Sequence, residues 1–136
     1  LLGDRRDVVT CARLRSMCEL ADDAIYDVAG KLSLAATAAA LSTCGGFMGN
    51  DTGVAHLAAA LGLPVVTIYG PSDRRKWFTP GPNRSALQRP LPCSPCFVFG
   101  TQRPCDHQQC LNEIAVEEVI EALHGVMAPA YSGRRQ

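Results

Sequence analysis

Two polar turns, each following an apolar run, carry the residues best suited to chemistry in this sequence. They lie in the stretch GNDTGVAHLAAALGLPVVTIYGPSD and read Asn50-Asp51-Thr52-Gly53 and Gly70-Pro71-Ser72-Asp73. The first turn leads into an alanine-rich segment that is predicted to be a helix. Unpaired N–H groups at a helix N-terminus attract anions such as phosphate, and a glycine there lets a ligand approach the backbone closely. The first turn therefore predicts an anion-binding site.

Two basic side chains could complete such a site. His56 lies four residues after Thr52, so it faces the same way one helical turn on, where it could donate a hydrogen bond to a phosphate oxygen. Lys31, just before another predicted helix, could add a point charge. Simpler interpretations stay open: Asx-Thr-Gly is a common capping sequence, a histidine among alanines is often a core residue, and Lys31 is equally typical of an ordinary surface.

Four cysteines in a proline-rich segment form a second candidate site, with the spacing Cys93-x2-Cys96-x8-Cys105-x4-Cys110. Cys-x2-Cys followed by two more cysteines is typical of a tetrahedral structural site for zinc or iron. His107 could replace one thiol. The segment has few apolar residues, so a metal would supply the order that it lacks. Reduced or paired cysteines without a metal are the alternative.

The elements that position these residues follow from the hydrophobic pattern. It predicts helices over residues 4–20, 34–41, 54–61 and 116–127, strands over 25–28, 44–48 and 65–69, and a strand stub at 1–2. Ser33 is the predicted N-cap of the helix over 34–41. Residues 71–104 are predicted to be largely irregular, because most of the prolines fall there. Strands alternating with helices indicate an α/β fold with a Rossmann-like parallel sheet and flanking helices. Both polar turns would then lie at the sheet edge where such folds bind ligands.

Composition narrows the class of protein. The chain has 136 residues, of which 47% are hydrophobic, enough for one domain with a real core. Its formal net charge of zero argues against a nucleic-acid surface. No apolar run is long enough to span a membrane, and no signal peptide is apparent. Seven cysteines, an odd number, favour a reducing compartment. The abrupt start, LLGDRRD, suggests a piece of a longer protein.

The stretch GKLSLAATAAALSTCGGFMGNDTGVAHLAAALGLPVVTIYGPSD closely resembles the C-terminal domain of glycosyltransferase family 9, the lipopolysaccharide heptosyltransferases. That family shows Gly-x-x-Ser-Leu, then Asn-Asp-Ser/Thr-Gly-x-x-His, then a proline-led strand ending in Gly-Pro-Ser/Thr. These elements occur here in order, and the resemblance extends from Gly3 to about Ala122. The cysteine cluster also occurs in many members of the family.

The resemblance implies the C-terminal half of a GT-B glycosyltransferase, in which two Rossmann-like domains flank a cleft. This half binds the nucleotide-sugar donor, ADP-heptose in the heptosyltransferases. The implied donor-binding residues are Asp51, Thr52, Gly53 and His56 at the diphosphate and sugar, Leu32 at the adenine and Asp7 at the ribose. Lys31 joins this donor-binding set through the point charge proposed above, not through the resemblance. We expect a donor-binding domain over residues 1–128, including a cysteine- and proline-rich insertion at 90–112, and a loose tail at 129–136.

The implied reaction is inverting transfer of a sugar to a lipopolysaccharide-type acceptor, without a catalytic metal. It would take place in the cytoplasm, with possible peripheral attachment to the inner face of the bacterial inner membrane. The N-terminal domain that binds the acceptor and is expected to supply the catalytic base has no counterpart in this sequence. We therefore assign no catalytic residue and expect the chain to be inactive alone. The alternatives are a non-catalytic nucleotide- or phosphate-binding module stabilised by a cysteine-ligated metal, and a structural interaction domain.

Overall fold

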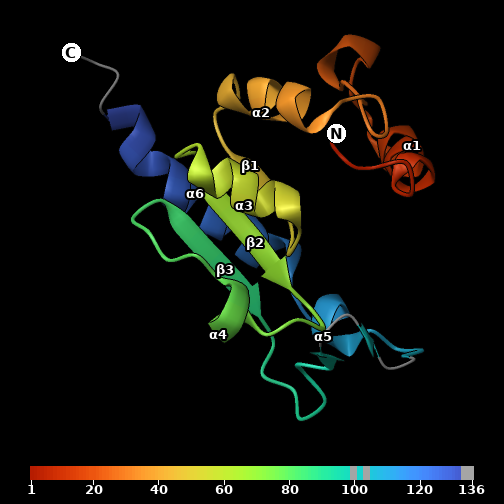
Figure 1. Cartoon of the computed structure of the whole chain (residues 1–136), viewed down its shortest axis with the longest axis vertical. Helices are drawn as coiled ribbons and strands as arrows, with labels where there is room; N and C mark the ends of the chain where they lie inside the picture. Colours follow the sequence, from red (N-terminus) through yellow and green to blue (C-terminus); the bar gives the residue numbers. More distant parts are fainter. Residues whose placement is uncertain (99–100, 103–104, 133–136) are drawn as a thin grey trace. The chain divides into compact units, whose positions relative to one another are not determined.

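The chain forms two compact units, each of which is described by itself. The computed structural model describes residues 1–98, 101–102 and 105–132, and its units are Leu1–Leu41 and Ser42–Gln136 (Figure 1). The first contains helix α1 (Val8–Met17), a 3-10 turn at Asp22–Ala24 and most of helix α2 (Leu34–Ser42).

Two extended segments of the first unit run side by side. The N–H groups of Val28 and Gly30 donate to the carbonyls of Leu1 and Gly3, at 3.1 and 2.9 Å. Alternate bonds of this kind are the pattern of parallel strands. The segments at 1–2 and 25–28 that were predicted as strands therefore pair, although neither becomes a regular strand.

The helices of the first unit begin at polar residues that hydrogen-bond the backbone. Ser33 Oγ accepts the N–H of Ala36 at 3.2 Å, so Ser33 caps α2 as predicted. The prediction of a helix over 4–20 was too long. Asp4 and Asp7 use their carboxylates to accept N–H groups in a tight turn, at 2.7 and 2.8 Å, which delays α1 until Val8.

The second unit is built on a parallel sheet in the order β1 (Phe47–Asn50), β2 (Val65–Tyr69), β3 (Arg84–Gln88). Helix α3 (Gly53–Ala60) connects β1 to β2 and packs on both, while α6 (Val116–Ser132) packs on β2 and β3 (Figure 1). The short helix α4 (Arg74–Trp77) connects β2 to β3. After β3 come an antiparallel pair of β4 (Phe97–Val98) and β5 (Thr101–Gln102), and then α5 (Gln109–Asn112). The predicted parallel sheet with flanking helices is confirmed.

The core of this unit lies between β2 and the two long helices. Val66 and Tyr69 of β2 are fully buried, as is Ala58 of α3, and Val126 of α6 is 5% exposed. The small alanines of α3 let the helix approach the sheet closely. This packing fixes the ends of β1 and β2, which carry the polar turns.

Three predicted boundaries were wrong. The first strand of this sheet begins at Phe47, not at residue 44, because its pairing with β2 starts where the N–H of Phe47 donates to Pro64 O. β3 falls in the segment predicted to be irregular. Its sequence RSALQ has no apolar run, which suits a strand whose residues are all half-buried. The last helix continues to Ser132, into the predicted tail, because alanines on both sides of Pro129 favour helix. Residues 133–136 lie outside the described residues.

Candidate functional site

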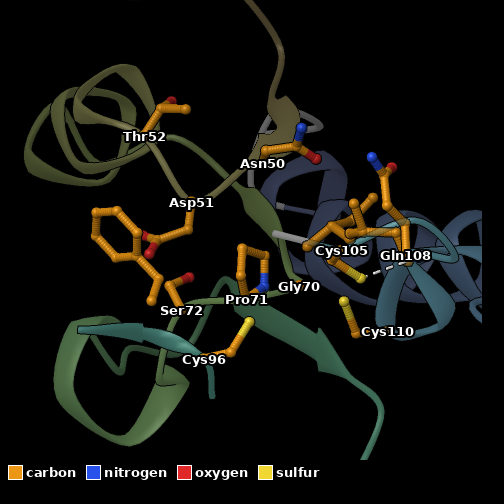
Figure 2. A pocket seen from close by; sticks show the side chains of 13 residues that line it. Asn50, Asp51, Thr52, Gly70, Pro71, Ser72, Cys96, Cys105, Gln108 and Cys110 are labelled. Atoms are coloured by element: carbon orange, nitrogen blue, oxygen red, sulfur yellow. Dashed lines mark hydrogen bonds between the residues drawn. The ribbon is translucent and has the colours of Figure 1, made fainter. Parts of the chain in front are cut away.

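A cavity of about 410 Å³ opens where β1 and β2 end (Figure 2). Residues of both polar turns line it: Asn50, Asp51 and Thr52 from the first, and Gly70, Pro71 and Ser72 from the second. The two turns therefore meet at one edge of the sheet, as the parallel topology predicts. This is the edge at which open α/β folds bind ligands.

The first turn of α3 leaves backbone donors free at this edge. Thr52 occupies the N-cap position in an extended conformation, but its hydroxyl makes no capping hydrogen bond. Within the part of the chain that the structure describes, the N–H groups of Gly53 and Val54 have no hydrogen-bond partner. Together with the positive end of the helix dipole, such groups favour a bound anion. The turn is thus not explained by side-chain capping.

Asp51 connects this turn to His56. Asp51 Oδ1 lies 3.6 Å from His56 Nε2, with the carboxylate side chain only 13% exposed and the histidine 41% exposed. His56 itself does not line the large cavity. It borders a small hollow on the α3 side of the sheet, beside Tyr69 and Arg84. The role of His56 at a donor therefore stays a prediction, and its link to the cavity runs through Asp51.

Tyr69 of β2 borders the same small hollow as His56 and lies within electrostatic reach of Asp51. Burial raises the pKa of the Tyr69 hydroxyl to about 12, and the negative charge of Asp51 adds to the shift. The residue is 1% exposed. The negative charge of Asp51 therefore acts on a buried side chain of the core as well as on the cavity.

The other predicted donor-binding residues belong to the first unit. Asp7 Oδ2 accepts the N–H of Asp4 at 2.8 Å, and Lys31 Nζ donates to Asp27 O at 2.7 Å. Leu32 is 37% exposed. These contacts are local, and the roles of Asp7, Lys31 and Leu32 toward a donor stay predictions.

The cysteine-rich segment forms the remaining wall of the cavity. Cys96, Cys105 and Cys110 line it, with Gln108 and Leu111 beside them (Figure 2). None of the seven cysteines, all of which lie among the described residues, forms a disulfide bond. Over residues 1–98, 101–102 and 105–132, no three His, Cys, Asp or Glu side chains are grouped closely enough to hold a metal ion. The metal site over Cys93, Cys96, Cys105 and Cys110 stays a prediction.

Sequence reasoning missed how this wall is attached. Ser94 Oγ donates to Gly70 O at 2.7 Å, and the N–H groups of Cys96 and Phe97 donate to Pro71 O at 2.8 and 2.9 Å. The segment is therefore fastened to the backbone of the second turn. No residue type in the sequence signals this, because the acceptors are main-chain carbonyls.

The model of glycosyltransferase family 9 (heptosyltransferase) matches residues 1–107. This chain belongs to glycosyltransferase family 9. It is 30% identical to lipopolysaccharide heptosyltransferase 2 of Salmonella typhimurium over 102 residues, which cover 75% of the chain and 29% of that protein. It is 33% identical to lipopolysaccharide heptosyltransferase 1 of Pseudomonas aeruginosa over 91 residues, covering 66% of the chain and 26% of that protein. The family 9 chain thus spans less than a third of these curated relatives.

Solved structures share the fold. The structure of E. coli ADP-heptose lps heptosyltransferase II matches with a TM-score of 0.74 at 23% identity, covering 96% of this chain and 36% of that one. A glycosyl transferase family 9 structure from Veillonella parvula matches with a TM-score of 0.73 at 22% identity, over 94% and 36% of the two chains. Among the described residues, no helix of this family 9 chain is long and apolar enough to cross a membrane.

Proposed function

We propose that this family 9 chain is the donor-binding half of an inverting glycosyltransferase, corresponding to the C-terminal half of a GT-B enzyme. The donor would be ADP-heptose and the acceptor a lipopolysaccharide-type saccharide. The cavity at the ends of β1 and β2 carries the proposal, because it combines free backbone donors with a carboxylate at the ligand-binding edge of the sheet.

The chemistry of the first turn fits a sugar diphosphate. The free N–H groups of Gly53 and Val54 would donate to diphosphate oxygens, and the Asp51 carboxylate would accept hydrogen bonds from sugar hydroxyls. When an acceptor displaces the diphosphate from the anomeric carbon, negative charge grows on the leaving oxygen. Fixed N–H donors gain strength as that charge develops, so they would stabilise the transition state without a metal.

His56 would act mainly through Asp51 in this scheme. Its Nε2 lies 3.6 Å from Asp51 Oδ1, so the ring would help to hold the carboxylate in place. The roles proposed for Leu32 at the adenine and Asp7 at the ribose rest on the family resemblance. The role proposed for Lys31 near the phosphates rests on its charge and on its position just before a helix.

The chain would not catalyse transfer alone. It spans about a quarter to a third of its relatives, and we place acceptor binding and the catalytic base in the N-terminal domain that it does not span. The odd number of cysteines, none of which forms a disulfide bond, agrees with a reducing compartment. We therefore propose a cytoplasmic location, at the inner face of the inner membrane where such acceptors would be presented.

Isothermal titration calorimetry of the purified chain with ADP-heptose, ADP, UDP and inorganic phosphate tests the proposal. We expect ADP-heptose to bind most tightly, ADP next, and UDP about tenfold or more weaker than ADP, a difference of roughly 1.4 kcal/mol. Equal binding of ADP, UDP and phosphate would favour the alternative, a non-catalytic phosphate-binding module. Absence of binding by a folded chain would contradict the proposal for this half alone.

A further inference from the structure

Strand β1 lies at one side of the parallel sheet and turns alternate residues away from its neighbour β2. The N–H groups of Phe47 and Asp51 donate to main-chain carbonyls on the β2 side, at 2.8 and 3.2 Å. Successive residues of a strand direct their main-chain groups to opposite edges, so Met48 and Asn50 face away from β2. Within the described residues of the second unit, β2 is the only strand that pairs with β1, and no main-chain hydrogen bond is found for Met48 or Asn50.

This open edge of β1 carries no protecting feature of its own. An open strand edge is a template for a further strand, and proteins commonly block it with charged side chains, prolines or bulges. The sequence of β1, Phe-Met-Gly-Asn, has no charge and no proline, and its register with β2 runs without a bulge. The Met48 side chain on this strand is an exposed apolar group, 52% accessible. The edge is therefore available for pairing.

The opposite edge of the same sheet, formed by β3, is blocked. Asn83 O accepts a hydrogen bond from β2 at 2.9 Å, so Ala86, three residues on, faces the outer edge. There Arg74 Nη1, from the connection between β2 and β3, donates to Ala86 O at 3.3 Å. Pro82 precedes the strand and Pro90 follows it. The sheet therefore protects the β3 edge and leaves the β1 edge open.

The free groups of β1 match an extended segment. Met48 and Asn50 each offer one N–H and one C=O at a spacing of two residues, which is the repeat that another strand presents. A second copy of the chain is a poor occupant, because an edge of four residues buries much less area than a stable dimer needs. The rest of the enzyme is a better source. The chain spans 29% of the Salmonella typhimurium heptosyltransferase 2 and 36% of the E. coli structure.

We propose that the open edge of β1 pairs with a strand from the part of the enzyme that this chain does not span. The added strand takes up the free main-chain groups of Met48 and Asn50 and extends the sheet beyond β1. It also steadies the end of β1, from which Asp51 and Thr52 continue into the cavity. The proposal rests on the proposed function in one respect, that the chain is one part of a larger glycosyltransferase.

Amide hydrogen exchange at single residues provides the first test. It compares this chain with a chimera in which the chain replaces the matching segment of the Salmonella typhimurium heptosyltransferase 2. We expect Met48 and Asn50 to exchange at least about tenfold more slowly in the chimera, because a hydrogen-bonded amide exchanges only when the structure opens. Gly49, which faces β2, should be protected in both proteins, and Ala86 should not change.

Two results of this comparison would overturn the proposal. The first is equal exchange of Met48 and Asn50 in the chain and in a folded chimera. The second is protection of both amides in the chain alone, because the chain or a dimer of it would then cover the edge without the rest of the enzyme.

A peptide experiment gives the answer if the chimera fails to fold. Peptides of about ten residues, near the upper length of a strand, would cover the part of the Salmonella typhimurium protein that this chain does not match. One of them should bind this chain and slow exchange at Met48 and Asn50, as in strand addition at other open sheet edges. Met48→Pro removes an outward-facing amide and should abolish binding, whereas Ala86→Pro, the matched change on β3, should not.

The peptide experiment has its own contrary outcomes. No binding by any peptide up to about 1 mM would overturn the proposal, and so would equal binding by the two proline variants. Calorimetry with ADP-heptose is read separately on the same chain. Failure of donor binding with a strand added at β1 would contradict only the proposed function, and donor binding without an added strand would contradict only this proposal.

Discussion

Asp51 Oδ1 and His56 Nε2 lie 3.6 Å apart at the start of α3, with the carboxylate more buried than the ring. This contact joins the cavity, which Asp51 lines, to the small hollow that His56 borders. Because the two side chains act on each other, their contributions to ligand binding should not be independent.

The first prediction concerns that pair. Asp51→Ala and His56→Ala should each weaken ADP-heptose binding, Asp51→Ala by about tenfold and His56→Ala by less, consistent with about 1–2 kcal/mol for a lost hydrogen bond. The double variant should lose little more than Asp51→Ala, because His56 acts through Asp51. Calorimetry on all four proteins measures the coupling, and fully additive losses would show that His56 contacts the donor on its own.

The second prediction isolates one backbone donor. Gly53→Pro removes the N–H at the first position of α3, where proline is tolerated, and the extended conformation of Thr52 suits a residue before proline. Gly53→Ala keeps the N–H, and its Cβ would meet nothing within 4 Å. We expect about tenfold weaker ADP binding in the proline variant, since a hydrogen bond to a charged group contributes roughly 1.5–3 kcal/mol. The alanine control should bind as wild type. Equal affinities in both variants would exclude this amide from the site.

The third prediction follows from Tyr69. Its pKa of about 12 exceeds the value near 10 expected in the unfolded chain, so the native state keeps the proton longer as the pH rises. The resulting stability is present below about pH 10 and is lost between about pH 10 and pH 12, up to roughly 2–3 kcal/mol. Urea unfolding at several alkaline pH values should show that the free energy of unfolding falls less with rising pH in Tyr69→Phe than in the wild type. Tyr26→Phe, at a 75% exposed position, should lose stability like wild type.

The fourth prediction concerns the start of α6. The Arg89 guanidinium lowers the pKa of Glu118, and the N–H of Ala115 lowers it further. The folded state therefore favours the ionised carboxylate of Glu118. Its contribution to the free energy of unfolding is present above about pH 4.5, the pKa in the unfolded chain, and is lost as the pH falls through the lower pKa of the folded state. Glu118→Gln should lower Tm by a few degrees at neutral pH, and its Tm should fall less than that of the wild type as the pH is lowered into mild acid. Glu117→Gln, in the same helical turn but without an ion pair to Arg89, should keep the wild-type acid profile.

The fifth prediction concerns the contact between β2 and α5. A Cβ at Gly70 would lie 2.8 Å from Leu111 Cδ2, so Gly70→Ala forces the leucine or its helix to move. We expect the free energy of unfolding to fall by about 1–3 kcal/mol, as for other overpacked sites. Chemical denaturation measures it. Gly70→Ala/Leu111→Val should recover part of the loss, whereas an unchanged midpoint in Gly70→Ala would show that α5 adjusts at no cost.

The sequence predicted those parts of the fold that depend on local pattern. The β-branched run of β2 was placed at its observed bounds, and Ser33 was identified as a cap, because both signals lie in the residues themselves. β3 was missed because a half-buried strand needs no apolar run, and it is specified by pairing with β2. The start of α1 was misjudged because side-chain hydrogen bonds in the preceding turn override the helical pattern.

In the candidate site, the sequence predicted where the two polar turns lie but not the contacts that the residues around them make. Parallel topology alone brought the two polar turns to one edge, which the cavity confirms. The contact of His56 with Asp51 was not predictable from its spacing, since the i to i+4 relation fixes a helix face but not which neighbour the ring contacts. The contribution of the cysteine-rich segment to the same cavity depends on long-range main-chain hydrogen bonds, which leave no trace in residue type.

The attachment of that segment to Gly70 O and Pro71 O has an evolutionary consequence. Main-chain carbonyls are present whatever residue occupies a position, so a segment fastened to them can be lengthened, exchanged or recomposed without rebuilding the sheet that receives it. The ends of β1 and β2 form the half of the pocket that the sheet constrains directly, whereas the sheet constrains the fastened segment only through main-chain hydrogen bonds. Diversification of ligand preference among proteins with this architecture should therefore concentrate in the fastened half.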